Sequence, residues 1–150
     1  LLVIDDLVLS TEHGPKGGDE INKIILGKNY GWPISSYGES YANDNLIYYK
    51  SHIENNFEEP IFSFIPSIGI SEIISLPDSF SPKWQNNFLI SSLNGRSLYR
   101  IKFNENFTKI VYKEKIFIGQ RIRDLKYDPD LNAILLSLED NGELGIIRSN

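Results

Sequence analysis

The stretch NFLISSLNGRSLYRIKF, residues 87–103, decides the fold class of this chain. Two runs rich in leucine, isoleucine and aromatic residues, Asn87–Leu93 and Ser97–Phe103, flank the dipeptide Asn94-Gly95. Asn-Gly between two apolar runs is typical of a tight turn that joins antiparallel strands, because both residues tolerate the backbone angles of such turns. The stretch therefore predicts a β-hairpin.

Short β-prone runs separated by turn residues continue in both directions. The predicted strands are Leu2–Ser10, Asn22–Leu26, Ile61–Ile65, Glu72–Leu76, Asn87–Leu93, Ser97–Phe103, Lys109–Ile118, Ile122–Tyr127, Ala133–Leu138 and Glu143–Arg148. In the hairpin, alternation puts Tyr99, Ile101 and Phe103 on one face and Leu98, Arg100 and Lys102 on the other. Helical periodicity is not sustained, and Asp78–Trp84 is expected to form a short helical turn. The pattern indicates a sandwich, a barrel or propeller blades, and does not choose among them.

Composition excludes several classes of function. The chain has 150 residues, enough for one domain, with a net charge of −5 and a pI near 5.0. This balance argues against a nucleic-acid surface, which needs a basic patch. The absence of cysteine removes disulfides, thiolate metal sites and cysteine nucleophiles. No apolar run is long enough to span a membrane. The sequence contains no methionine and opens at Leu1, so we expect a fragment of a longer chain.

Residues 11–33, TEHGPKGGDEINKIILGKNYGWP, combine a tight turn with acidic side chains. The turn residues Gly14, Pro15, Gly17 and Gly18 direct carbonyl oxygens outward, and Glu12, Asp19 and Glu20 surround them. Oxygen ligands without thiols suit a hard cation, Ca²⁺ before any transition metal. A phosphate-binding loop is disfavoured, because two carboxylates follow the glycines.

The same segment resembles a known family. EHGPKGGDE followed by GKNYGWP resembles the soluble pyrroloquinoline quinone (PQQ) dependent sugar dehydrogenases of the glucose/sorbosone dehydrogenase family. IPSIGIS, FLISSLNGRSLYRI and GQRIRDLKYDPD extend the resemblance in the same order. The resemblance implies an all-β, partial six-bladed β-propeller, with residues 1–150 as the C-terminal portion, two and a half to three blades, and the N-terminal blades missing. Tyr41–Glu59 would be a long loop at the rim.

The resemblance also implies two calcium sites made of backbone oxygens. Gly14 and Pro15 would hold the Ca²⁺ beneath PQQ, although a plain hairpin turn is the alternative. Glu20 and Tyr30 would hold a second, structural Ca²⁺, and the alternative is a core tyrosine beside a turn. Trp32 and Pro33 are expected to anchor the loop by burial.

Arg121 and Arg123 are separated by one residue on a predicted strand, so both side chains leave one face while Ile122 points into the core. Two adjacent guanidiniums repel each other unless an anion lies opposite, and guanidinium matches carboxylate bidentately. The resemblance implies that this anion is PQQ, which carries three carboxylates. The alternative is a surface pair, with one arginine bonded to Asp124 or Asp128.

Other polar positions follow from the resemblance alone. Ser67 and Asn94 fall where the family contacts the quinone, and glucose-oxidising relatives carry lysine in place of Asn94. Ile65 stands where some relatives have tryptophan. His13 lines the cofactor pocket or is an ordinary polar histidine beside the turn. His52, in the polar stretch SHIENN, is predicted to be exposed.

The functional prediction is a periplasmic or secreted bacterial aldose dehydrogenase that uses PQQ, Ca²⁺ and an external electron acceptor. In the family, a histidine base takes part in hydride transfer from the anomeric carbon of the sugar. Neither His13 nor His52 matches its motif, so the chain alone is expected to be inactive. A partial propeller leaves apolar blade faces and unpaired strand edges exposed, so these residues alone are expected to be marginally stable. The alternative function is a non-catalytic propeller binding module; the retained cofactor motifs and the lack of cysteine favour the enzyme.

Overall fold

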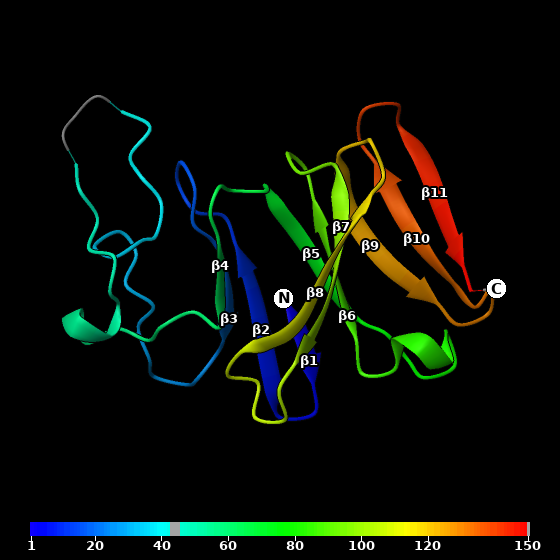
Figure 1. The fold of residues 1–150 in the computed structure, drawn as a ribbon, viewed down its shortest axis with the longest axis horizontal. Coiled ribbons are helices and arrows are strands. Elements are labelled where there is room, and N and C mark those ends of the chain that lie inside the picture. The colour runs from blue at the N-terminus through cyan, green and yellow to red at the C-terminus, as the bar shows by residue number, and fades with distance from the viewer. Residues whose placement is uncertain (43–45, 150) are drawn as a thin grey trace.

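A computed structural model describes residues 1–42 and 46–149, and its strands form three antiparallel sheets. The first sheet contains β1 (Leu2–Ile4), β2 (Leu7–Glu12), β3 (Asp19–Lys23) and β4 (Phe62–Phe64). The second contains β5 (Ile70–Ser75), β6 (Phe88–Ser92), β7 (Ser97–Phe103) and β8 (Ile110–Phe117). The third contains β9 (Ile122–Asp128), β10 (Ala133–Leu138) and β11 (Glu143–Arg148). Figure 1 shows the sheets side by side, in chain order from left to right.

Each sheet is a meander, because consecutive strands are paired with their neighbours in sequence. The predicted hairpin of residues 87–103 is confirmed: β6 and β7 pair with Ile90 opposite Tyr99. The predicted single strand Leu2–Ser10 is wrong. It is a hairpin of β1 and β2, broken where Asp5 takes a positive φ of 48°, a conformation that aspartate tolerates in turns.

Two hydrophobic clusters lie between neighbouring sheets. Leu9, Ile21, Ile90 and Ile101 belong to the cluster that joins the first and second sheets. The cluster between the second and third sheets contains Leu89, Leu98, Ile122, Leu125, Ile134 and Leu136. The second sheet is thus buried on both faces, which explains why both alternating sets of β7 include fully buried residues. Sheets stacked face to face in chain order are the packing of propeller blades.

Helical structure in the described residues is limited to two 3₁₀ turns. The turn η2 (Pro82–Trp84) lies within the predicted Asp78–Trp84, and η1 (Ile53–Asn55) was not predicted. No helix in this part of the chain is long and apolar enough to cross a membrane.

A long connection, residues 24–61, joins β3 to β4 and packs against the first sheet. Residues 43–45 of the predicted rim loop Tyr41–Glu59 lie outside the described residues. The connection reaches the turn between β2 and β3, where Lys16 and Glu39 exchange two backbone hydrogen bonds of 2.9 Å.

Strand direction decides which connections meet. Because successive strands are antiparallel, connections 13–18, 65–69, 93–96, 118–121 and 139–142 all emerge at one end of the sheets, the upper end in Figure 1. We call this end the upper rim. The sequence motifs that carry the predicted cofactor contacts lie on it.

Candidate functional site

A buried carboxylate holds the 13–18 turn in place. Asp19 has no exposed surface. Its Oδ1 accepts hydrogen bonds from the Gly14 N–H (3.1 Å) and the Ser67 hydroxyl, and its Oδ2 accepts from the N–H groups of Ile68 (3.0 Å) and Ile70 (2.9 Å). The start of β3 is therefore tied both to its own turn and to the loop that leads into the second sheet. Ser67, predicted to contact the quinone, directs its hydroxyl to Asp19.

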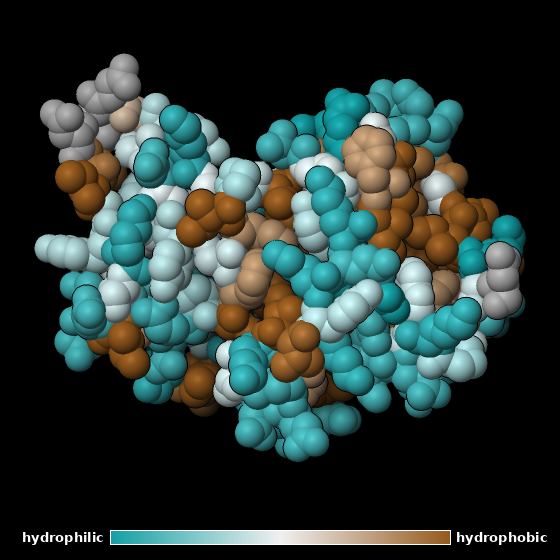
Figure 2. Space-filling model, viewed as in Figure 1, coloured by the Kyte–Doolittle hydropathy of each residue, from teal (hydrophilic) through white to brown (hydrophobic). Residues whose placement is uncertain are grey.

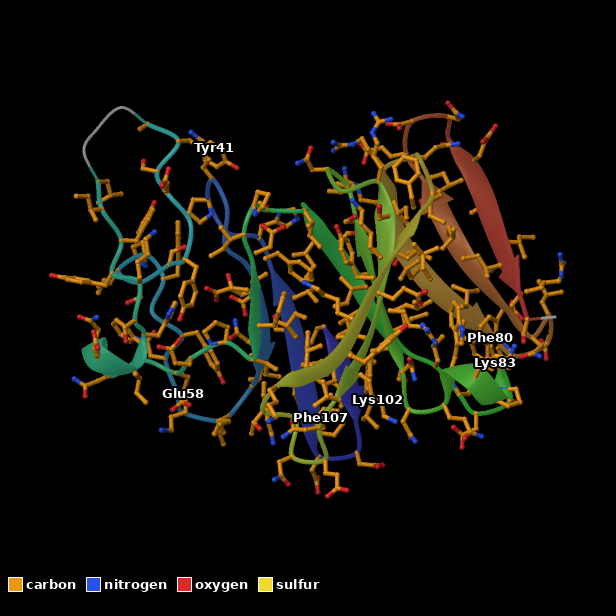
Figure 3. All side chains as sticks on the ribbon, in the orientation of Figure 1. Tyr41, Glu58, Phe80, Lys83, Lys102 and Phe107 are labelled. Atoms are coloured by element: carbon orange, nitrogen blue, oxygen red, sulfur yellow. The ribbon has the colours of Figure 1, made fainter. Side chains whose placement is uncertain are left out.

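The turn is too closely packed to accept side chains at Gly14 and Gly18. A Cβ on Gly14 would lie 2.2 Å from the carbonyl oxygen of Gly18, and Gly18 itself has a φ of +73° with its Cβ position 2.4 Å from the Gly38 nitrogen. The Tyr41 hydroxyl donates a 3.2 Å hydrogen bond to the Pro15 carbonyl. Figure 3 labels Tyr41 beside the upper end of the first sheet. Because a carbonyl oxygen has two lone pairs, Pro15 keeps one for a cation.

Backbone hydrogen bonds continue across the upper rim from sheet to sheet. The Gly95 N–H donates to the Ile68 carbonyl (2.8 Å), which joins the 65–69 loop to the β6–β7 turn. The Gly119 N–H donates to the Arg96 carbonyl (3.0 Å), which joins that turn to the connection before β9. The rim is therefore one continuous layer of bonded loops.

Side chains make a second link just below the rim. Thr11 on β2 donates to the Ser71 carbonyl on β5 (3.1 Å), and the Ser71 hydroxyl donates to the Ile122 carbonyl on β9 (2.7 Å). Ile122 is fully buried, as predicted. The strand β9, which carries Arg123 and directly follows Arg121, is thus fixed through β5 to the strand that leads into the 13–18 turn.

The arginine pair shares one carboxylate. Arg123 Nη2 donates to Glu139 Oε2, and Arg121 Nε lies 3.4 Å from Glu139 Oε1. The exposed fractions of the side chains are 36% for Arg121 and 55% for Arg123. The surface pairing with Asp124 or Asp128 that the sequence left open is wrong, because β10 brings Glu139 beside both guanidiniums.

Several predicted positions therefore share the upper rim although they come from different sheets. Gly14, Pro15, Ser67, Asn94 and Arg121 all lie on its connections, and Asn94 is exposed in the β6–β7 turn. Figure 2 shows the upper surface indented between the long connection on the left and the turns of the second and third sheets on the right.

A small polar cavity of about 50 Å³ lies beside the turn. Its lining residues are Glu12, His13, Gly14, Gly18, Glu20, Tyr30, Trp32, Ser35 and Ser36. The structure thus gathers four predicted residues, His13, Gly14, Glu20 and Tyr30, around one space. The Tyr30 hydroxyl donates to the Lys23 carbonyl and accepts from the Ile25 N–H, both at 2.7 Å, which fixes the backbone on which Tyr30 stands.

The chemistry of this cavity fits a hard cation. Burial raises the pKa of Glu20 to about 7; a hydrogen bond from Asn22 opposes the shift, and the charges of Glu12 and Glu59 add to it. The Asn22 amide nitrogen contacts Glu12 Oε1 (3.2 Å) and Glu20 Oε2 (3.3 Å). Asn22 Oδ1 and Ser35 Oγ are buried without a hydrogen-bond partner. Unpartnered buried oxygens beside carboxylates are the environment that a calcium ion satisfies.

A cation here would depend on peptide oxygens for much of its coordination. In residues 1–42 and 46–149, no group of three or more His, Cys, Asp or Glu side chains is arranged to hold a metal ion. The backbone ligands Gly14, Pro15, Glu20 and Tyr30 stay predictions.

The prediction that His52 is exposed is wrong. Its side chain is 1% exposed, with Nε2 3.7 Å from Glu20 Oε1 and Nδ1 3.7 Å from Glu59 Oε2. Burial lowers the pKa of His52, and the charge of Glu59 opposes that shift. The Tyr37 hydroxyl donates to Glu59 (2.8 Å), as do the backbone N–H groups of His52 (2.8 Å) and Ile53 (3.0 Å). Burial raises the pKa of Glu59, but these hydrogen bonds outweigh it and the net shift is downward.

The sequence did not predict this cluster of His52, Glu20 and Glu59, because the residues that bury it come from segments far apart in the chain. The stretch SHIENN looks solvated, yet the long connection folds it against β3. One signal was present: the alternation Glu20–Ile21–Asn22 puts two polar side chains on the face of β3 opposite the core. That face needed polar partners.

The predicted burial of Trp32 is also wrong, because its side chain is 63% exposed and its ring lies 5.6 Å from that of Tyr48. The neighbouring Gly31 is the buried residue. A Cβ there would lie 2.9 Å from Ser35 Cβ and 3.1 Å from the His52 ring. The tight backbone approach at Gly31 anchors the loop and leaves the indole at the surface.

A larger cavity, about 560 Å³, opens at the other end of the sheets. Phe88, Phe103 and Phe107 line it, with Lys102 among the polar lining residues, and Figure 3 labels Lys102 and Phe107 at that lower end. None of the predicted site residues lies there, so the cation and arginine chemistry belongs to the upper rim.

The buried Glu20 predicts a pH dependence of stability. Its ordinary pKa is 4.5 and its folded-state pKa is about 7, so between these values the folded chain holds a proton that the unfolded chain has lost. The contribution of this proton to the free energy of unfolding is fully present below pH 4.5. As the pH rises through 7 the contribution is lost, and the free energy of unfolding falls by roughly 1–3 kcal/mol. With a chelator present, Glu20→Gln should remove this part of the pH slope in urea unfolding. Glu105→Gln, on an exposed residue, should leave it; equal slopes for wild type and Glu20→Gln would contradict the assignment.

The fold and the rim define a class of protein: stacked antiparallel meanders in the manner of propeller blades, with a glycine turn beside carboxylates and an arginine pair on one rim. The family model described as Glucose / Sorbosone dehydrogenase matches residues 3–148. The chain belongs to the glucose/sorbosone dehydrogenase family, as the sequence predicted.

Known proteins agree with this assignment. The chain is 36% identical over 135 residues to an Escherichia coli protein named aldose sugar dehydrogenase, covering 89% of this chain and 36% of that protein. It is 27% identical over 116 residues to quinoprotein glucose dehydrogenase B of Acinetobacter calcoaceticus, covering 74% of this chain and 22% of that protein. A crystal structure of a glucose dehydrogenase superposes with a TM-score of 0.83 at 28% identity, over 97% of this chain and 42% of the other.

These matches confirm the all-β, partial propeller fold. They also establish the extent of the chain relative to its family: it spans about a third of the length of the Escherichia coli relative and less than half of the superposed structure.

Proposed function

We propose that these residues belong to a PQQ- and calcium-dependent dehydrogenase that oxidises the anomeric carbon of aldose sugars. The observation that carries the proposal is the upper rim. Continuous hydrogen bonds there link the Gly14–Pro15 turn, across three sheets, to the segment of Arg121 and Arg123 at the start of β9. One relative is named a quinoprotein and another an aldose sugar dehydrogenase, which supports the same chemistry.

The domain proposal follows from the extent of the chain. Residues 1–150 would be the C-terminal portion of one propeller whose other blades lie elsewhere in the polypeptide. The chain covers 36% of the Escherichia coli relative and 42% of the superposed structure, which supports a partial propeller. We place the complete protein in the periplasm or outside the cell, as the resemblance to its family implies.

The 13–18 turn would hold the cofactor calcium on the carbonyls of Gly14 and Pro15. Asp19 fixes the Gly14 N–H, and the packing around Gly14 and Gly18 leaves no room for a side chain at either position. The second calcium would use the carbonyls of Glu20 and Tyr30 beside the small cavity, where the unpartnered Asn22 Oδ1 is a further oxygen donor.

The arginine pair would bind and orient the cofactor through its carboxylates. The buried Ile122 anchors the backbone between the two arginines. Their guanidinium groups would therefore fix the orientation in which an acidic ring binds. Asn94 and His13 would line the same space. The chemistry supplied by bound PQQ and Ca²⁺ is hydride acceptance at a carbonyl polarised by the cation, followed by reoxidation by an external electron acceptor.

The proton-accepting base is proposed to come from another part of the complete protein. His52 is buried between Glu20 and Glu59 behind the first sheet, where no sugar reaches it. His13 is exposed beside the turn, and in residues 1–42 and 46–149 no carboxylate orients its ring.

A titration of the complete protein with PQQ, with and without Ca²⁺, tests the proposal through the absorbance of the quinone. We expect saturable binding that requires Ca²⁺, and sugar-dependent dye reduction once both are bound. The 150 residues alone should show no such reduction. Failure of the complete protein to bind PQQ in the presence of Ca²⁺ would refute the assignment.

A further inference from the structure

We propose that Glu139 is an internal competitor for the arginine pair, which the cofactor must displace in order to bind. The inference rests on the proposed function, since it assigns PQQ carboxylates to Arg121 and Arg123. The sequence singled out these arginines but gave Glu139 no part in the site. The structure places its carboxylate on the guanidinium groups that an acidic ligand would use.

The backbone fixes Glu139 beside the pair. The Glu139 N–H donates to the Arg121 carbonyl at 2.9 Å, at the junction of β10 with the 139–142 turn. From this point each carboxylate oxygen faces a different arginine, Oε1 toward Arg121 and Oε2 toward Arg123. A carboxylate that bridges two guanidiniums is the same contact that a carboxylate on a rigid ring would make.

The next acidic residue has a different role. Asp140 Oδ2 lies 3.4 Å from Arg96 Nη1 and accepts a 3.3 Å hydrogen bond from the Arg121 backbone N–H. Asp140 therefore holds the chain before β9, while Glu139 holds the two guanidinium groups. Substituting Glu139 changes the arginine side chains without removing this backbone support.

The sign of the effect follows from three contributions. Neutralising Glu139 frees N–H groups of both arginines and removes a negative charge that would repel the ligand carboxylates; both changes strengthen binding. The opposing contribution is lost ordering of two long side chains. That ordering is worth little, because all three side chains are at least 36% exposed and water competes for their charged groups. Exposed ion pairs contribute little through rigidity, so we expect the first two contributions to dominate.

The experiment compares wild type, Glu139→Gln and Asp124→Asn in the complete protein with Ca²⁺ present, by titrating PQQ and following its absorbance. Asp124 is the matched control: it is one residue from Arg123, is exposed, and its Oδ1 accepts the adjacent Leu125 N–H (2.8 Å) instead of an arginine. We expect Glu139→Gln to lower the Kd about tenfold, with Asp124→Asn within about twofold of wild type. The increase in PQQ affinity caused by Glu139→Gln should be smaller when Arg123 is also replaced by alanine.

Two results would overturn the competition. Equal or weaker binding by Glu139→Gln, while wild type binds PQQ normally, would show that Glu139 orders the arginines or does nothing. Equal gains for Glu139→Gln and Asp124→Asn would show a general charge effect. Failure of wild type itself to bind PQQ is a different outcome, because it refutes the proposed function together with the inference built on it.

Discussion

Replacement of Asp19 by asparagine is expected to lower the free energy of unfolding by about 3 kcal/mol, because hydrogen bonds to a buried charge are strong and an unpaired buried donor is costly. The carboxylate accepts four hydrogen bonds, two on each oxygen. An amide keeps one oxygen. The amide nitrogen would best take the place of Oδ1. The Ser67 hydroxyl can then rotate to accept a hydrogen bond from that nitrogen, and the N–H groups of Ile68 and Ile70 still donate to the amide oxygen. The Gly14 N–H then loses its partner.

Gly14 belongs to the proposed cation site, so the lost hydrogen bond no longer pre-positions the peptide oxygens there. Asp19→Asn should therefore also weaken Ca²⁺ binding, by roughly tenfold or more. Urea unfolding in a chelator measures the stability, and calorimetric Ca²⁺ titration measures the affinity. Asp130→Asn is the control, since Asp130 lies exposed in the β9–β10 turn. Wild-type stability in Asp19→Asn would show that the four bonds do not hold the turn.

The double variant Arg121→Ala/Arg123→Ala is expected to weaken PQQ binding by roughly 10²–10⁴-fold, because each charge-assisted bond contributes about 1.5–3 kcal/mol. Stability should change little. Both side chains are at least one third exposed, and the Glu139 carboxylate that they leave unpaired is 37% exposed and accessible to water.

Three measurements separate a loss of cofactor binding from a loss of fold in this variant. PQQ titration gives the affinity, Ca²⁺ titration without PQQ should match wild type, and thermal unfolding should show a similar transition. Arg148→Ala on β11 removes an exposed arginine as a control. PQQ affinity within about threefold of wild type would place the acidic ring elsewhere on the molecule, because even one lost charge-assisted bond should exceed that change.

Much of the fold was predictable because it depends on residues that are close together in the sequence. Strands Ser97–Phe103, Ala133–Leu138 and Glu143–Arg148 match β7, β10 and β11 residue for residue, since β-prone runs ended at clear turns. The error at Leu2–Ser10 has a different cause: the apolar residues on both sides of Asp5 and Asp6 outweighed the turn signal that the two aspartates carry.

The candidate site was predictable to the extent that it follows the chain. The tight turn at Gly14 and the common face of Arg121 and Arg123 depend on spacing and backbone geometry. Their partners come from distant segments. Glu139 reaches the arginines through the pairing of β9 with β10, and His52 reaches Glu20 through the long connection.

By itself the sequence determined the all-β class, the family, the turn at Gly14 and the shared direction of the two guanidiniums, because each depends on residues that are neighbours along the chain. The tertiary structure alone decided that Asp19 fastens the turn, that Glu139 pairs with the arginines and that His52 is buried while Trp32 is exposed. Burial and pairing depend on which distant segment covers a given face, and local residue patterns do not specify that choice.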